Sequence, residues 1–537
     1  MAESEVIFNN VFSDVEVERS NCTGLFTEQN GDECFYPNGN ETCDGECVTL
    51  DADSCSTNRY PPAPTCNLDC PIFPNIGDCA NTLRDLRCVM CVEARAIASG
   101  ANMRSPPYVY RLCPNTFFSI NNETEDVIFP ILNGTRILCG TDGDIANNCT
   151  IDSGVLQVEI GQVFRDPNDS FVSPLPLKSV EISGLSFTNG IYDSRLDLSP
   201  SIWTRAPQEV VAVFQDCRWS GGIGSNLLAS VNGDGSGGTS QSASVLFSKC
   251  VFENIVGPPT HEAIYSVSGT VAMTNVQVKN YALEAGFGRF EDSTFVATDV
   301  TFSNSTTTNG GEVSVIKSTL DSSVKLTRCE VRGNSFSEFL LVKDGSAYVD
   351  ESIFSDNEGT VDVFASGSSE IATSLTLRNC TFEETKVANL VVVNNASLTV
   401  DSSVFIDTIA DIGIEGANMT LKITDTCFLG GEYTYPVFVR DSDESFENVY
   451  GENIVALCSG IAISDSDNCL DVFDCPASCV DFDADSCFLV PQITSQAPSA
   501  APSAVPITKT AGPTDSSSSC KSVRAAVLGF LIATSIY

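Results

Sequence analysis

The sequence predicts an all-β protein built as a parallel solenoid, and three observations carry this prediction. An eight-residue pattern recurs ten times between Val180 and Phe428. Its first and third positions are apolar, its sixth is small and its eighth is aromatic. The small positions follow one another at intervals of 23 to 33 residues, the length of a repeat that adds one coil to a solenoid. Within each unit the apolar residues alternate, as they do in a strand with one buried face.

The aromatic position of the pattern defines a column along the predicted solenoid. Eight of the ten residues that stand two places after the small position are aromatic. The small positions are Leu185, Cys217, Cys250, Val276, Val300, Cys329, Ser352, Cys380, Ser403 and Thr426. Like residues fall on like residues in such a stack. We therefore expect about ten or more coils, with Phe382, Phe405 and Phe428 in one buried column.

Two other repeat architectures fit less well. A β-propeller blade needs about 40 residues, whereas the shortest intervals here are 23 residues. Helical repeats are disfavoured because Val, Ile, Thr, Ser and Phe dominate the units, and the i, i+3, i+4 periodicity of a helix is missing.

The chain divides into six predicted segments. A remnant of a preceding solenoid end with a cysteine module spans residues 1–60, and a cysteine-rich linker or cap with a modestly helical stretch spans 61–107. The solenoid spans 108–435, and Cys113, Cys139 and Cys149 are expected to staple its first coils. A second cysteine-rich cap or module spans 436–490. A Pro/Ser/Ala-rich stalk, predicted to be disordered, spans 491–520, and a hydrophobic tail spans 521–537.

An internal repeat defines the first of these segments. Residues 47–55 read CVTLDADSC and residues 479–487 read CVDFDADSC, and each run follows a Cys-x-x-x-Cys step. Residues 8–12 read FNNVF, which echoes FENVY at residues 446–450. The first twenty residues lack the basic and apolar regions of a signal peptide. We therefore expect the chain to be part of a longer tandem protein.

Cysteine usage indicates an oxidising compartment. Thirteen of the 24 cysteines precede residue 150, and six lie between Cys427 and Cys487, a density typical of disulfide-bonded secreted proteins. Asn-x-Ser/Thr sites agree with secretion. The glycosylation candidates are Asn122, Asn133, Asn148, Asn168, Asn304, Asn379, Asn395 and Asn418. A zinc site is the weaker interpretation, because Cys88 and Cys91 have no second such pair nearby and His261 is the single histidine.

The charge balance limits the partners. Acidic residues outnumber basic residues 70 to 28, and the formal charge is −42. This charge argues against binding to the phosphate backbone of nucleic acids. No cofactor is expected, and calcium is the alternative, at Asp51 and Asp53 or at Asp481, Asp483 and Asp485. Neither run contains a full calcium-binding loop, so surface acids are the simpler interpretation.

The C-terminal end resembles an attachment signal for a glycosylphosphatidylinositol (GPI) lipid. The tail Ala525–Tyr537 is apolar and, at 13 residues, too short to cross a bilayer of about 30 Å. It follows small residues at Ser516–Ser519 and a polar spacer. The pattern predicts attachment to the membrane at the cell surface through a lipid at Ser516. A tail anchor and a chance apolar end are the alternatives.

Several segments resemble a known group of proteins. The runs YRLCPNTFFSI and CGTDGDIANNCTI, together with the xxCxFxxN repeats, resemble the right-handed parallel β-helix proteins of the pectate-lyase-like superfamily. The cysteine modules and the stalk are similar to those of large secreted proteins of diatoms and other stramenopiles. The resemblance covers about residues 108–435 and implies a right-handed parallel β-helix. It leaves the activity open, because one fold hosts many functions.

The resemblance allows catalytic motifs to be checked. The Asn-Thr-Asp, Asp-Asp, Gly-His-Gly and Arg-x-Lys motifs of polygalacturonase-type sites do not occur in the repeats, and His261 lies in a predicted loop. The best candidates for an enzymatic site are Asp299, Arg328 and Glu351, which precede the small position in three successive units and place an arginine between two acids. A ladder of ion pairs between coils is the simpler interpretation.

The buried column of small residues raises a further alternative. Cys217 and Cys250 lie in adjacent units, and a disulfide between them is one hypothesis. A packed ladder of thiols is the simpler interpretation.

Together these patterns predict an extracellular, membrane-tethered β-helix protein with a structural, adhesive or polysaccharide-contacting role and no catalysis. A polysaccharide or a cell-wall matrix is the expected partner. The alternative is a carbohydrate-active enzyme on the same fold, namely a polysaccharide lyase, a glycoside hydrolase or an epimerase.

Overall fold

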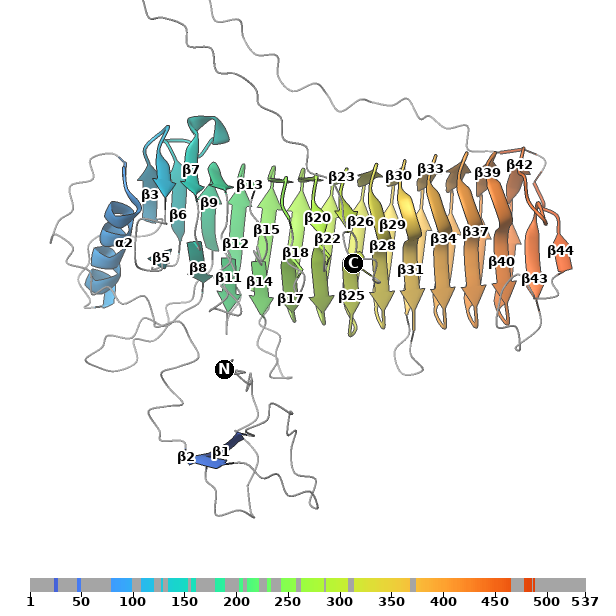
Figure 1. Cartoon of the computed structure of the whole chain (residues 1–537), viewed down its shortest axis with the longest axis horizontal. Coiled ribbons are helices and arrows are strands. Elements are labelled where there is room, and N and C mark those ends of the chain that lie inside the picture. The colour runs from blue at the N-terminus through green and yellow to red at the C-terminus, as the bar shows by residue number, and fades with distance from the viewer. Residues whose placement is uncertain are drawn as a thin grey trace, which may run out of the picture. The chain divides into compact units, whose positions relative to one another are not determined.

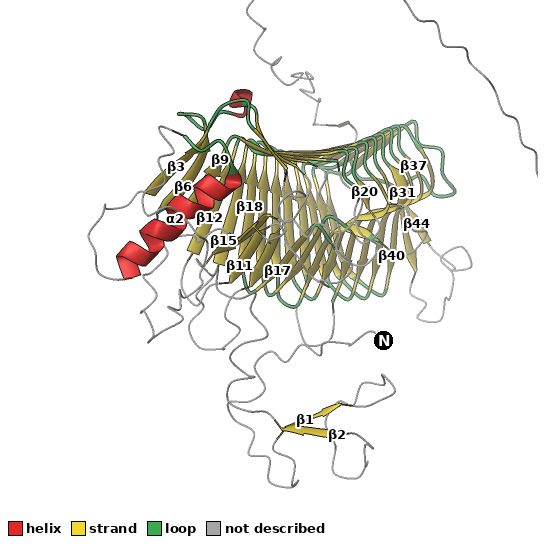
Figure 2. Cartoon of the chain, turned by 60° about the vertical axis from the view of Figure 1, so that its left-hand side comes forward, coloured by secondary structure: helices red, strands yellow, loops and turns green. Residues whose placement is uncertain are grey.

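Three sheets form the body of the protein, and successive coils of the chain add strands to the three sheets in turn. The strands are parallel except for the last pair of the third sheet. The computed structural model describes residues 24–27, 46–49, 79–98, 108–119, 127–128, 134–152, 156–160, 179–188, 202–205, 210–221, 229–232, 243–256, 262–283, 286–307, 313–367, 373–464, 478–484 and 486–487. Figure 1 shows the strands side by side between α2 (Leu83–Ala98) and β44 (Ser478–Val480). In Figure 2 the turns that link the sheets follow one another in rows.

The first sheet contains thirteen described strands. They are β3 (Tyr108–Leu112), β6 (Thr135–Cys139), β9 (Ser179–Ser183), β12 (Val210–Gln215), β15 (Ala243–Ser248), β18 (Thr270–Thr274), β22 (Thr294–Thr298), β26 (Ser323–Thr327), β29 (Ser346–Asp350), β32 (Ser374–Arg378), β35 (Ser397–Asp401), β38 (Thr420–Thr424) and β41 (Asp443–Glu447).

The second sheet also contains thirteen described strands, most of them three residues long. They are β4 (Phe117–Ser119), β7 (Cys149–Asp152), β10 (Leu185–Thr188), β13 (Arg218–Ser220), β16 (Val251–Glu253), β19 (Gln277–Lys279), β23 (Thr301–Ser303), β27 (Glu330–Arg332), β30 (Ile353–Ser355), β33 (Thr381–Glu383), β36 (Val404–Ile406), β39 (Cys427–Leu429) and β42 (Tyr450–Glu452).

The third sheet contains sixteen described strands. They are β5 (Val127–Ile128), β8 (Leu156–Ile160), β11 (Ile202–Arg205), β14 (Ala229–Asn232), β17 (Ile264–Val267), β20 (Ala282–Leu283), β21 (Gly288–Glu291), β24 (Thr306–Thr307), β25 (Ser314–Thr319), β28 (Ser335–Lys343), β31 (Glu358–Ser366), β34 (Lys386–Asn394), β37 (Ile409–Ala417), β40 (Glu432–Arg440), β43 (Ile461–Ser464) and β44. Outside these sheets, β1 (Gly24–Thr27) pairs antiparallel with β2 (Glu46–Thr49), and a short 3₁₀ helix spans Ile145–Asn147.

The chain passes from the first sheet to the second through one residue in the left-handed backbone region. In all ten predicted units, the residue before the small position has a positive φ, between 48° and 74°. Asn, Asp and Gly adopt this conformation most readily, which explains residues such as Asn275, Asp425 and Gly184 at the bend. Arg328 also holds it, and its backbone N–H donates to the carbonyl of Asp350 in the next coil at 3.0 Å.

The core contains the predicted column of aromatic rings. Phe354, Phe382, Phe405 and Phe428 are fully buried and stand opposite one another in successive strands. Neighbouring rings in this run are stacked, with centroids 4.7 to 4.9 Å apart and interplanar angles of 7° to 9°. The solenoid prediction and this column are therefore confirmed.

Thiols and hydroxyls alternate at four successive positions of the small column, Cys329, Ser352, Cys380 and Ser403. Ser403 Oγ donates to the carbonyl of Asp401 at 3.0 Å and accepts the N–H of Cys380 at 3.2 Å. The Cys380 thiol contacts the carbonyls of Val349 and Arg378. A small polar side chain at this position therefore satisfies backbone groups that the bend leaves inside the core.

Both ends of the β-helix carry disulfides. At the first end, Cys79 is bonded to Cys113 and Cys139 to Cys149, and α2 contributes Glu93 as acceptor for the Tyr110 hydroxyl. The predicted stapling of the first coils by cysteines is therefore confirmed. At the other end, Cys427 is bonded to Cys487 and Cys458 to Cys479.

The β-helix is longer than the ten repeats indicate. The strands of the first two sheets include two coils before Val180 and one after Phe428 that depart from the full pattern. For example, Gly451 stands opposite Phe428 where an aromatic residue is expected. The predicted boundary at residue 435 falls within β40, and the coil continues through β41 and β42.

Candidate functional site

The enzymatic candidates lie at the bend between the first and second sheets. Arg328 donates to both carboxylate oxygens of Asp299, from Nε at 2.7 Å and from Nη2 at 3.0 Å. This pair lowers the pKa of Asp299 and raises that of Arg328. Glu351 occupies the same bend position one coil further along and acts on Arg328 through its charge. All three side chains are exposed, so the bend carries an ionised, solvent-facing acid–arginine pair.

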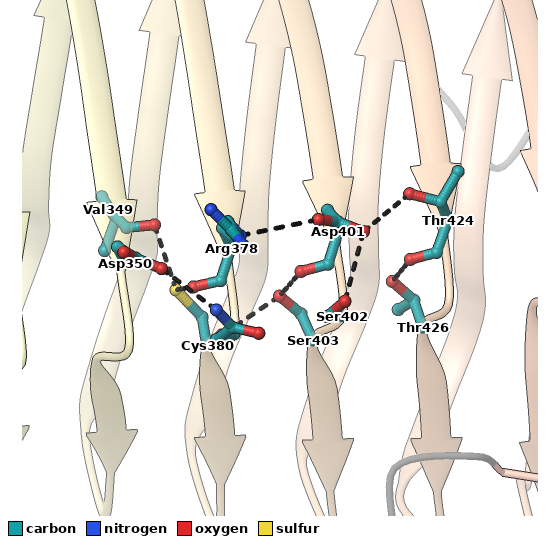
Figure 3. Close-up of polar contacts among 10 residues, drawn as sticks. Val349, Asp350, Arg378, Cys380, Asp401, Ser402, Ser403, Thr424 and Thr426 are labelled. Atoms are coloured by element: carbon teal, nitrogen blue, oxygen red, sulfur yellow. Dashed lines mark hydrogen bonds and ion pairs between the residues drawn. The ribbon is translucent and has the colours of Figure 1, made fainter.

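A second group of charges lies beside this bend, at the last outward position of the first sheet (Figure 3). Asp350, Arg378 and Asp401 stand opposite one another in β29, β32 and β35. Arg378 Nε lies 3.8 Å from Asp401 Oδ2, and Asp401 Oδ1 accepts from Thr424 Oγ1 at 3.0 Å. Asn379 Nδ2 donates to Asp350 Oδ1 at 3.2 Å.

Sequence reasoning missed this second group because it followed only the residue directly before the small position. The residue one place further back shows the same acid–arginine–acid order in three successive coils. This order could have been recognised in the sequence. Tyr348 in β29 raises the pKa of Arg378, and Asp350 and Asp401 add to that effect. The two groups together form a charged edge along the coils that contain residues 299 to 401.

The outer face of the first sheet continues from this edge. Its first outward column is an unbroken, in-register ladder of hydroxyl side chains. The ladder consists of Ser244, Thr270, Thr294, Ser323, Ser346, Ser374, Ser397 and Thr420. All eight are half-buried or exposed. In the next column, Lys325 Nζ lies 5.8 Å from the centroid of the half-buried Tyr348 ring.

We name these parts together the hydroxyl face, meaning the eight-residue ladder with Lys325, Tyr348 and the charged edge. The coil spacing of about 4.8 Å separates successive groups along it. Such a regular array of donors and acceptors beside an aromatic ring is chemically suited to contacting an extended hydroxyl-rich polymer.

A further acid outside the hydroxyl face has a displaced pKa. Burial raises the pKa of Glu383 in β33, and the nearby charges of Glu384 and Asp356 raise it further. Arg332 opposes this effect. Sequence reasoning did not single out Glu383, because its position one residue after the aromatic column holds residues of every kind in other coils.

The thiols of the small column are buried and reduced. Cys217, Cys250, Cys329 and Cys380 are free, so the disulfide considered between Cys217 and Cys250 is not present. Burial raises the pKa of Cys329 to about 11 and that of Cys380 to about 12. The thiolate is the reactive form of cysteine, so this column is structural.

The remaining predicted positions divide between described and undescribed residues. Five glycosylation candidates are exposed at positive-φ bends, namely Asn148, Asn304, Asn379, Asn395 and Asn418. Asn122, Asn133, Asn168, His261, Ser516 and the tail Ala525–Tyr537 lie outside the described residues, as do Asp51, Asp53 and Asp485.

One of the possible calcium ligands, Asp483, accepts hydrogen bonds from the backbone of the last coil. Both carboxylate oxygens of Asp483 accept backbone N–H groups, from Asn448 at 3.1 Å and from Val449 at 2.7 Å. Within the described ranges, no group of three or more His, Cys, Asp or Glu side chains is arranged to hold a metal ion. The described part of the chain also contains no helix long and apolar enough to span a membrane.

Comparison with known proteins identifies the class of the body. Residues 229–405 match the family model described as a right handed beta helix region. This match and the three sheets of parallel strands define a right-handed β-helix domain. No curated protein matches the chain at a significant level.

The chain is also similar to several solved structures. The surface protein and adhesin PfbA of Streptococcus pneumoniae is 11% identical, with 71% of this chain and 99% of that chain covered and a TM-score of 0.30. Tailspike protein 3 of bacteriophage CBA120 is 12% identical, with 73% and 62% covered and a TM-score of 0.27. The mannuronan C-5 epimerase AlgE4 A-module of Azotobacter vinelandii is 9% identical, with 72% and 100% covered and a TM-score of 0.25. At these values the matches carry no information on function.

Proposed function

We propose that the protein is a non-catalytic, extracellular β-helix that contacts a neutral polysaccharide through its hydroxyl face. The single observation that carries this proposal is the unbroken ladder of eight hydroxyl side chains from Ser244 to Thr420. Each rung repeats at the coil spacing, so a long polymer lying across the coils meets the same chemistry many times. Once one rung holds the polymer, the neighbouring rungs meet it at a high effective concentration, so many weak contacts together give a higher affinity.

Charge selects a neutral polymer over an acidic one. The formal charge of the chain is −42, and like-charge repulsion disfavours a polyanion over such a surface. The charged edge adds Asp350, Glu351 and Asp401, whose carboxylates accept hydrogen bonds from sugar hydroxyls. Tyr348 offers an apolar ring with a polar end, a combination favoured in binding surfaces.

The test is binding of the full chain to insoluble neutral polysaccharides such as cellulose, chitin and β-1,3-glucan particles. The chain should sediment with at least one of them. The triple variant Ser346→Glu, Tyr348→Ala, Ser374→Glu should bind at least about tenfold more weakly, equal to about 1.4 kcal/mol. Ser303→Glu, on the outer side of β23 between Lys279 and Arg332, is the matched control and should bind normally. Equal binding by all three proteins would refute the hydroxyl face as the contact surface.

We also propose attachment at the cell surface. The disulfides described at both ends of the β-helix are suited to an oxidising compartment. The apolar C-terminal tail supports a lipid at Ser516. In cells that express the chain behind a working signal peptide, phospholipase C specific for phosphatidylinositol should release it. Recovery of an intact C-terminal peptide ending at Tyr537 from membranes would contradict this attachment.

One observation favours a carbohydrate-active enzyme as the second candidate. Glu383 has a raised pKa and lies near Asp356 and Glu384, and a glycoside hydrolase uses one protonated and one ionised acid. Soluble sugars released from a polysaccharide by the chain, and lost with Glu383→Gln, would support this candidate over the non-catalytic one.

A further inference from the structure

We call residues 458–487, at the C-terminal end of the β-helix, the end module, and the structure describes residues 458–464, 478–484 and 486–487 of it. It begins with an antiparallel hairpin of β43 and β44, in which Ile461 stands opposite Val480 and Ala462 opposite Cys479. The disulfide Cys458–Cys479 ties the hairpin together.

The end module then closes the last coil. The Phe482 ring stacks on Phe428 with centroids 5.3 Å apart, and Asp483 accepts the backbone N–H groups of Asn448 and Val449. Cys487 is bonded to Cys427 in the coil before the last. The module thus covers the open end of the aromatic column and satisfies donors at the terminal strand edge, which an uncovered solenoid would expose.

A second hairpin in the chain has the same register. β1 pairs antiparallel with β2, with Leu25 opposite Val48 and Phe26 opposite Cys47. Cys47 and Val48 begin the run CVTLDADSC, as Cys479 and Val480 begin CVDFDADSC. Aligning the two runs therefore also aligns the two hairpins.

The cysteines follow the same order in both places. The first set is Cys22, Cys34, Cys43, Cys47 and Cys55, and the second set is Cys458, Cys469, Cys475, Cys479 and Cys487. The successive intervals are 12, 9, 4 and 8 residues in the first set and 11, 6, 4 and 8 in the second. Cys22 precedes Gly24 as Cys458 precedes Gly460. Outside the two described strands, this correspondence is one of sequence.

We propose that residues 22–55 form a second end module, closed by a Cys22–Cys47 disulfide and built to cover the terminal coil of a parallel β-helix. Leu50 takes the place of Phe482, Asp51 that of Asp483 and Cys55 that of Cys487. The partner surface is thus a terminal coil with an apolar core for Leu50, unpaired backbone N–H groups for Asp51 and a cysteine in the preceding coil for Cys55. Each disulfide forms by exchange, in which two thiols give two electrons and two protons to a disulfide oxidant of the compartment.

The first test is a disulfide map of the full chain, secreted and digested without reduction. Mass spectrometry should recover Cys22 joined to Cys47, alongside Cys458 joined to Cys479. Recovery of Cys22 as a free thiol, or joined to Cys34 or Cys43, would overturn the proposed pairing.

The second test exchanges the modules. In a full chain whose residues 458–487 are replaced by a copy of residues 22–55, hydrogen-exchange protection of β38 to β42 should stay within about tenfold of the parent. The cysteine transplanted from position 55 should be joined to Cys427. The same chimaera with Leu50→Asp and Asp51→Ala in the transplanted copy should lose this protection. Equal loss in the unmodified chimaera would overturn the end-covering role.

Discussion

The ring of Phe482 stacks on that of Phe428 at an interplanar angle of 4°, and it occupies the space that Gly451 leaves in the last coil. Gly451 stands opposite Phe428 in the strand register, and a side chain there would clash with the Phe482 ring. The aromatic column therefore ends with a residue that comes from beyond the last coil. This relationship makes the end module part of the core.

Phe482→Ala should destabilise the last coils selectively. Truncating a buried phenylalanine costs about 3–5 kcal/mol, and the half-buried Phe482 should lie at or below the low end of that range. Hydrogen exchange should accelerate in β38 to β42, while β12 to β18 should keep their protection. Val480→Ala, at an exposed position of the same module, is the control. Uniform acceleration along the whole β-helix would contradict a local role for Phe482.

Phe405→Ala should be more costly, because this ring is fully buried between Phe382 and Phe428. The expected loss is about 3–5 kcal/mol, measured as a fall in denaturation midpoint. Thr399→Ala, on the outer side of β35, should change the midpoint little. A Phe405→Ala protein as stable as the Thr399→Ala protein would argue against the stacked column as a main source of stability.

Much of this fold was predictable because every coil needs the same type of residue at the same position. Phe382, Phe405 and Phe428 recur at one position since in-register stacking places each on its predecessor. The residue before the small position also recurs in every unit, and Asn379 and Asp425 are residue types that fit its left-handed conformation well. Local chemistry and global stacking agree at these positions.

The sequence was less informative where the role of a residue depends only on residues that are close in space and distant in sequence. The acid–arginine–acid order of Asp350, Arg378 and Asp401 becomes a group only when the exact register is known. Phe482 belongs to no repeat, so its place over Phe428 could not be read from periodicity. Asp362 gives no signal either, because strand alternation does not predict that three consecutive residues, Val361, Asp362 and Val363, are all buried.

The proposed absence of catalysis predicts that the purified chain neither cleaves nor eliminates acidic or neutral polysaccharides, with or without calcium. The physical reason is that Asp299 and Arg328 form an ionised, solvent-exposed pair, whereas acid catalysis requires a proton donor. Release of reducing or unsaturated sugars is the measurement. Turnover abolished by Arg328→Ala, and retained in Lys386→Ala at an exposed position of β34, would establish an enzymatic site at the bend.

The last prediction concerns Asp362, a fully buried acid in β31. It lies between Val361 and Val363, which pair with Glu338 and Leu340, and so stands level with Phe339. The Phe339 ring contacts Phe354 in the core at 5.7 Å. Neither carboxyl oxygen of Asp362 has a hydrogen-bond partner among the described residues. Burial raises its pKa to about 8.

This raised pKa sets the sign of a pH effect. An unfolded aspartate loses its proton near pH 4, whereas folded Asp362 keeps its proton until about pH 8. Between these values unfolding releases a proton, so the contribution of Asp362 to stability is greatest below pH 4 and falls as the pH rises to 8. Asp362→Leu should remove this fall and, because an unsatisfied buried polar group costs about 1–3 kcal/mol, raise the melting temperature at pH 7 to 8. Glu358→Gln, an exposed acid in the same strand, should leave the pH profile unchanged. If the melting temperatures of Asp362→Leu and the parent changed in the same way from pH 4 to 8, Asp362 would not be protonated in the folded core.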